Sequence, residues 1–70
     1  MTKQQKQILD YVVKFGSITP FQAFSDLGIT KLATRVSELQ RQGYVFNKKW
    51  ETSTNRFGET VRYMRYSYDN

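Results

Sequence analysis

Apolar side chains near the start of the chain recur at steps of three and four residues, which is the spacing of one face of an α-helix. The set is Ile8, Leu9, Val12 and Phe15. Thr2 and Gln5 precede the set in the T-x-x-Q order of a capping box, and Gly16 follows it. The pattern predicts a first helix over residues 3–15, with lysines mostly on its solvent side.

A second capping box begins a little further along the chain. Thr19 is the expected N-cap, Pro20 takes the first helical position, and Gln22 takes the third. Apolar residues then follow at helical spacing, at Phe21, Phe24 and Leu27. We expect a short bridging strand over residues 17–19 and a second helix over residues 20–27.

A third helix is predicted after Gly28 breaks the second and Ile29 enters the core. Its apolar side carries Leu32, Val36 and Leu39. Its opposite side is small and polar, with Thr30, Thr34, Ser37 and Arg41, flanked by Ala33 and Glu38. Thr30 is a suitable N-cap and Gly43 a suitable left-handed end, so the helix is expected over residues 31–42. Two capped helices joined by a few residues around a glycine form a helix-turn-helix.

Beyond Gly43 the polar and apolar positions alternate, as they do in a β-strand. One face carries Tyr44, Phe46 and Trp50, and the other carries Val45, Asn47 and Lys49. We expect a strand over residues 44–50, a loop of six or seven residues within 52–58, and a second strand over residues 60–68. The core face of that second strand is expected to hold Met64, Tyr66 and Tyr68. The prediction is a hairpin over residues 44–68, with the last two residues as a short tail.

The predicted order is helix, short strand, helix, turn, helix, strand, loop, strand. This is the α+β topology of a winged helix-turn-helix, with three helices and a C-terminal β-hairpin wing. Seventy residues leave no room for a second domain, so we expect a single domain over residues 1–70.

Composition narrows the function. Eleven Lys and Arg against six Asp and Glu give a net charge of +5 and a pI near 9.8, which favours a polyanionic partner. The chain has no Cys and no His, its carboxylates are scattered, and it has no Gly-rich phosphate loop. We therefore expect no enzyme activity, metal or cofactor. Without a membrane-spanning apolar run or a signal-peptide region, the sequence indicates a cytoplasmic protein that does not enter membranes.

Motifs spread over nearly the whole chain resemble a family of small winged helix-turn-helix proteins common in phages and prophages. They are Ile18-Thr19-Pro20 with Ala23, Leu27-Gly28-Ile29, Leu32-Ala33-Thr34-Arg35-Val36 with Leu39, Gly43-Tyr44, and Arg62-Tyr63 in the last strand. Many of these are core and turn residues, so they specify the fold more closely than the function. The resemblance implies a small regulator that binds DNA.

The third helix supplies candidate contacts to DNA. The residues are Thr30, Lys31, Thr34, Arg35, Ser37, Glu38 and Arg41. In a major groove the N-terminal half of the helix lies deepest, so Lys31 and Thr34 are the better candidates for base edges, and Arg41 for the backbone. Arg35 lies beside the apolar stripe, which favours packing and an acidic partner over a DNA contact. Glu38 would repel phosphate unless it accepts from a cytosine amine or pairs with a neighbouring arginine.

The hairpin supplies a second group of candidates, close to its loop. They are Lys48, Lys49, Asn55, Arg56 and Arg62, and the hairpin also holds Arg65. Cations here can bind phosphates in or beside the minor groove, and Asn55 and Arg56 at the tip are the residues most expected to contact DNA. The alternative is that lysine and arginine protect the exposed strand edges from aggregation, and both roles can hold together.

Two functions remain open from the sequence. The first is a double-stranded DNA-binding protein of a phage or mobile element, acting as a transcriptional regulator or a recombination accessory factor, with a homodimer expected on repeated half-sites. The second is a winged-helix module that binds a host protein, for example an inhibitor of a nucleic-acid-processing enzyme. The exposed aromatics expected at Trp50, Tyr63 and Tyr68 would suit the second function.

Overall fold

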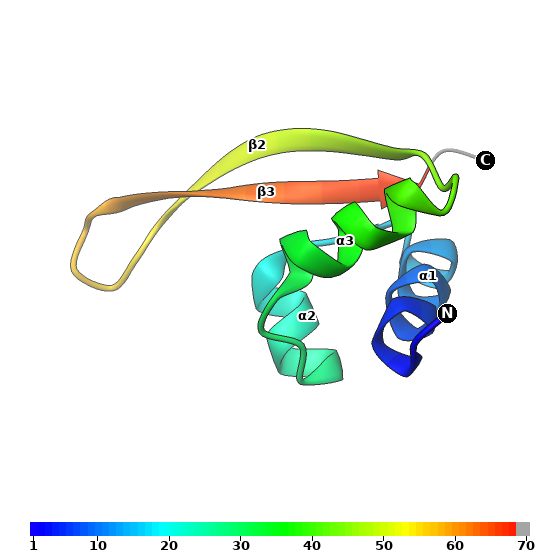
Figure 1. The fold of residues 1–70 in the computed structure, drawn as a ribbon. Helices are drawn as coiled ribbons and strands as arrows, with labels where there is room; N and C mark the ends of the chain where they lie inside the picture. Colours follow the sequence, from blue (N-terminus) through cyan, green and yellow to red (C-terminus); the bar gives the residue numbers. More distant parts are fainter. Residues whose placement is uncertain (69–70) are drawn as a thin grey trace.

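Three helices lie on one side of a three-stranded antiparallel sheet in residues 1–68, the part of the chain that the computed structural model describes (Figure 1). The elements are α1 (Lys3–Phe15), β1 (Ser17–Ile18), α2 (Pro20–Leu27), α3 (Leu32–Arg41), β2 (Phe46–Thr54) and β3 (Thr60–Tyr68). The strand order is β1-β3-β2, so the last strand is central and joins the short first strand to the hairpin. The α+β winged-helix prediction is confirmed, and the expected tail at residues 69–70 lies outside the described residues.

Both predicted capping boxes are present. The Thr2 hydroxyl accepts from the backbone N–H of Gln5, whose side-chain oxygen accepts in return from the Thr2 N–H. Thr19 and Gln22 repeat the arrangement at the start of α2. Each pair satisfies two amides that the helix itself leaves without partners, so both helices begin at the predicted residues.

The core lies between the helices and the base of the sheet. Its buried members are Ile8, Val12, Ile18, Ala23, Ile29, Leu32, Val36, Leu39, Phe46 and Tyr66. The predicted apolar side of α3 is therefore confirmed, as is the placing of Ile29. Met64 and Tyr68 pack against this core from β3, as expected. None of the helices in residues 1–68 is long and apolar enough to cross a membrane.

Helix α2 turns an unexpected side to the core. Ala23 is fully buried, whereas Phe21 is 76% exposed and Phe24 is 62% exposed. Ala23 occupies the position where α2 packs against its neighbours, and its small side chain lets the helix approach closely. The large rings at the other positions are left on the surface. Phe15, which belongs to the apolar pattern of α1, is also exposed and stacks at 4.7 Å on Tyr11 instead of entering the core.

The start of α3 differs from the prediction. Lys31 is the N-cap residue, without a side-chain capping bond, and Thr30 lies outside the helix. Burial of Ile29, whose N–H donates to the Ala23 carbonyl at 2.9 Å, ties this segment to α2 and delays the next helix by one residue. The N-cap role predicted for Thr30 is therefore wrong.

Helix α3 ends at Arg41, one residue before the predicted end, and the left-handed conformation predicted for Gly43 is confirmed. Gly43 has a φ of +103°, the N–H of Tyr44 donates to the Leu39 carbonyl, and the N–H of Gly43 donates to the Gln40 carbonyl. These two bonds form a Schellman motif, which needs a left-handed residue that glycine adopts without steric cost.

The hairpin is longer and its loop tighter than predicted. Strand β2 continues to Thr54, which pairs with Thr60, so a strand end near Trp50 and a loop of six or seven residues are both wrong. At the tip, the N–H of Gly58 donates to the Asn55 carbonyl at 3.0 Å, and Gly58 has a φ of +77°. This is a type I turn followed by a left-handed residue, a common hairpin connection. The hairpin projects past the helices and gives the molecule its 39 Å length (Figure 1).

Candidate nucleic-acid interface

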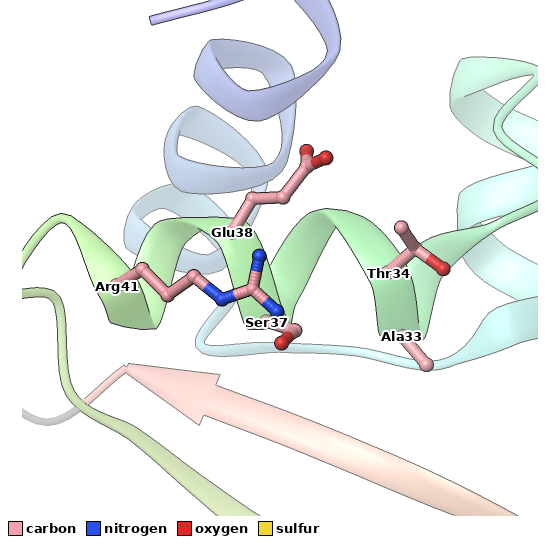
Figure 2. A pocket seen from close by; sticks show the side chains of 5 residues that line it. All are labelled: Ala33, Thr34, Ser37, Glu38 and Arg41. Carbon is pink, nitrogen blue, oxygen red and sulfur yellow. The ribbon is translucent and has the colours of Figure 1, made fainter.

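The side of α3 that faces away from the core is a shallow depression in the surface. It is lined by Ala33, Thr34, Ser37, Glu38 and Arg41 (Figure 2). The side chains of Ala33, Thr34 and Ser37 are short, and Arg41 extends along the helix surface (Figure 2). The small, polar character predicted for this face is present, so another surface can approach the helix backbone closely.

The one carboxylate of α3 belongs to an internal network. Glu38 points toward α1 (Figure 2), and its Oε1 accepts from Arg35 Nη1 and from Gln5 Nε2, both at 2.9 Å. The Oε1 of Gln5 accepts in turn from Gln42 Nε2 at 3.0 Å. The network joins the start of α1 to Glu38 in α3 and to Gln42 just after α3, and Gln5 at its centre is only 5% exposed.

This network settles two open points from the sequence. The pairing of Glu38 with Arg35 is present, and Arg35 lies beside the apolar stripe with 26% of its side chain exposed. Arg35 is therefore held by a structural contact, and the negative charge of Glu38 is balanced within the protein. The capping role of Gln5 was predicted, but its bonds to Glu38 and Gln42 were not, because these partners lie more than 30 positions away in the chain.

The hairpin holds its basic residues in two different ways. Arg65 donates to Glu51 at 2.8 Å and to the Ser17 hydroxyl at 2.8 Å, which fastens β3 to both neighbouring strands. This bond from Arg65 holds the pKa of the Glu51 carboxyl below its ordinary value. The remaining cations, Lys48, Lys49, Arg56 and Arg62, are exposed and make no ion pair with any residue from 1 to 68.

Strand register places these cations on both faces of the hairpin. Opposite residues share a face, so Lys48, opposite Tyr66, lies on the face that continues from the core. Arg62 lies on the same face, with its guanidinium 4.7 Å from the Trp50 ring centre. Lys49, opposite Arg65, lies on the other face. The hairpin thus carries positive charge all round.

The tip of the hairpin is ordered by Asn55. Its side-chain oxygen accepts from the N–H groups of Phe57 at 2.9 Å and Glu59 at 3.1 Å. Asn55, which was predicted to contact DNA, therefore stabilises the turn. Arg56 and Phe57 occupy the two central turn positions and are exposed, Phe57 to 81%. The sequence analysis assigned no role to Phe57. A large apolar residue between an arginine and a glycine in a turn nevertheless indicates an exposed ring at the tip.

The two predicted groups of residues lie on separate elements, α3 and the hairpin. The hairpin projects past the end of α3 at which that helix begins, where Thr30 and Lys31 are exposed (Figure 1). Helix α3 therefore supplies small polar groups and the hairpin supplies cations. Trp50 is exposed as expected, whereas Tyr63 and Tyr68 are half-buried and do not form an open aromatic surface.

Comparison with known proteins agrees with this architecture. No curated protein matches the chain. The family described as winged helix-turn-helix domain matches residues 3–69. Since this match spans α1 to the end of the hairpin, the chain belongs to the winged helix-turn-helix domain family.

Proposed function

We propose that the protein binds double-stranded DNA, with α3 in the major groove and the hairpin on the neighbouring backbone. The observation that carries this proposal is the combination of a small, polar helix face with a hairpin whose exposed cations have no ion-pair partner among residues 1–68. An α-helix with its side chains is about 10–12 Å across, and the major groove is about 12 Å wide, so α3, whose outer side chains are short, can enter it. The internal balance of Glu38 removes the main electrostatic objection.

Individual roles follow from position. Lys31 and Thr34 lie in the N-terminal part of the exposed face and are the candidates for base edges, with Thr30 beside them. Ser37 lies midway, and Arg41, one turn further on, is placed for the phosphate backbone. Arg35 and Glu38 hold the helix in place from the side that faces α1.

The family membership and the basic charge support DNA binding, and the resemblance to phage and prophage winged helix-turn-helix proteins favours a small transcriptional regulator or a recombination accessory factor of a phage or mobile element. A protomer of this size offers a limited contact area, which favours binding as a homodimer or side by side on repeated half-sites. Helix α1 or the hairpin would provide the contact between protomers.

A second candidate is a module that binds a host protein. Phe21 and Phe24, exposed on α2, are the specific observation in its favour, because large exposed rings often anchor protein interfaces. Truncation of these rings separates the two functions. DNA binding predicts that F21A and F24A leave duplex affinity unchanged, whereas a protein module predicts loss of the partner.

Amide-shift mapping by NMR with a generic duplex tests the proposed function without knowledge of the target site. We expect shifts at Thr30 to Arg41 and at the hairpin, and they should fade as salt rises. With about four to six phosphate contacts, the slope of log K against log salt should be roughly −4 to −5. A duplex that leaves these amides unmoved at low salt would refute the proposal.

Charge reversal provides the matched comparison. K48E, K49E and R56E together should abolish duplex binding, because they replace three exposed cations of the hairpin. The triple reversal K3E, K6E and K14E on α1 makes the same change in net charge at three exposed lysines of α1 and should leave most of the affinity. Equal losses from both variants would show that only the overall charge matters.

A further inference from the structure

The hairpin tip combines a cation and a large apolar ring at its most distant point. Arg56 and Phe57 are consecutive, and Phe57 is the most exposed of the large apolar residues, at 81%. The ring makes no contact with the core, so its position does not stabilise the fold. An isolated exposed phenylalanine is common, but Phe57 lies at the end of a hairpin that carries several cations, where it would contact a bound nucleic acid.

Hydrogen bonds within the turn order the backbone that carries this ring. The Asn55 side chain accepts from the N–H of Phe57 itself, and Gly58 supplies the left-handed residue after it. The Asn55 N–H also donates to the Glu59 carbonyl at 2.9 Å, which closes the hairpin directly behind the turn. Because the backbone is already ordered, presenting Phe57 to a partner costs little further conformational entropy.

The length of the exposed arm fits the spacing of DNA grooves. All residues from 52 to 62 are exposed, so the last three residues of β2, the first three of β3 and the turn between them stand clear of the body; the five steps from Thr52 to Phe57 span at most about 17 Å at the usual rise. This equals about half a turn of B-DNA, whose full turn is about 34 Å. With α3 in the major groove, the tip therefore reaches the adjacent minor groove.

We infer that Arg56 and Phe57 enter that minor groove and that Phe57 wedges between two base pairs, so that the protein bends the duplex it binds. This inference rests on the proposed function and adds a deformation of the DNA to it. Apolar side chains that enter the minor groove unstack a base step and kink the duplex toward the major groove. Pyrimidine–purine steps such as TA deform most easily and are the expected point of entry. The positive charge of Arg56 attracts the hairpin tip to the negatively charged minor groove.

The test uses a mixed-sequence duplex of about two helical turns with central TA steps. A donor and an acceptor dye on its two ends report bending, and 2-aminopurine at a TA step reports unstacking. Both signals are measured at saturating protein and low salt for the wild type, F57A, F57L, R56A and F21A. Phe21 is the matched control because it is a similarly exposed ring on α2, outside the proposed surface.

The expected result is that the wild type brings the duplex ends closer and increases 2-aminopurine fluorescence. F57A should lose more than half of both changes while its Kd rises less than about tenfold, a difference of about 1.4 kcal/mol. F57L keeps an apolar wedge and should retain most of the bend, and F21A should behave as the wild type. R56A should weaken binding and reduce the salt slope by about one.

Two results would overturn the inference while leaving the proposed function intact. One is a wild type that binds the duplex without a change in end-to-end distance or in 2-aminopurine fluorescence. The other is an F57A variant that bends the duplex as the wild type does, which would point to Phe57 as a contact for a protein. A wild type that fails to bind the duplex at low salt would refute the proposed function itself.

Discussion

Replacing Gln5 by alanine should destabilise the protein more than any other change of a polar side chain on α1. Gln5 is 5% exposed, and its side chain accepts from the Thr2 N–H and from Gln42 while donating to Glu38. Loss of half a capping box costs about 0.5–1 kcal/mol, and loss of a partly buried bond to a carboxylate costs about 1–1.5 kcal/mol. With the weaker bond to Gln42, the expected loss in the free energy of unfolding is about 2–3 kcal/mol.

This loss is large for a chain of this size. A domain of seventy residues has a free energy of unfolding of about 4–10 kcal/mol, so Q5A should lower the melting temperature by about 10–20 °C. Urea denaturation followed by circular dichroism measures the change, with an unchanged m-value as the sign that the same cooperative unit unfolds.

The neighbouring glutamine provides the control. Gln4 lies on the same turn of α1, is exposed and has no side-chain hydrogen bond within residues 1–68, so Q4A should change stability by less than about 0.5 kcal/mol. A double-mutant cycle between Q5A and E38A should show a coupling of about 1 kcal/mol. If Q5A and Q4A have the same stability, the network does not join α1 to α3 as the structure indicates.

Three further predictions concern packing, pH and the turn. A23L should cost about 1–3 kcal/mol by overfilling the contact of α2 with the core, whereas F21A should cost less than about 0.5 kcal/mol, both by urea denaturation. The lowered pKa of Glu51 gives stability that is present above its ordinary pKa of 4.5 and is lost as the pH falls; E51Q should show a weaker loss between neutral and acidic pH. A wild type and E51Q with the same pH profile would mean that the bond to Arg65 is absent in solution. G58A should cost about 1–2 kcal/mol through backbone strain alone, because nothing lies within 4 Å of an added Cβ and φ is +77°; a neutral G58A would show that the turn adopts another form.

Features set by neighbours in the sequence were predictable. Thr2 with Gln5 and Thr19 with Gln22 satisfy backbone groups three residues away, so local chemistry alone fixed where α1 and α2 begin. The left-handed end of α3 at Gly43 followed from the same kind of argument. The candidate residues on α3 were predicted from helical angle, and the structure places Thr34, Ser37 and Arg41 along one side of the helix, whereas Arg35 and Glu38 pair on the side that faces α1.

Features set by distant contacts were not predictable. Helical spacing singled out Phe21, Phe24 and Leu27 as the apolar positions of α2, whereas the close approach of α2 to its neighbours buries Ala23 and leaves Phe21 and Phe24 exposed. The binding of Glu38 by Gln5 depends on the packing of α1 against α3. The extension of β2 to Thr54 was hidden because both faces of the distal hairpin meet solvent, so no apolar alternation marks it.

That solvent-exposed arm also divides the molecule into parts of unequal rigidity. Residues 52–62 are exposed throughout, whereas the base of the hairpin is held by Phe46, Tyr66 and the pairing of β3 with β1. Amide hydrogen exchange should therefore be slow near Tyr66, where exposure needs global unfolding, and many-fold faster beyond Trp50, where opening the distal ladder is enough. An arm that flexes on a rigid base can follow grooves of different width while α3 stays in one position, so the domain can tolerate variation in the shape of its target.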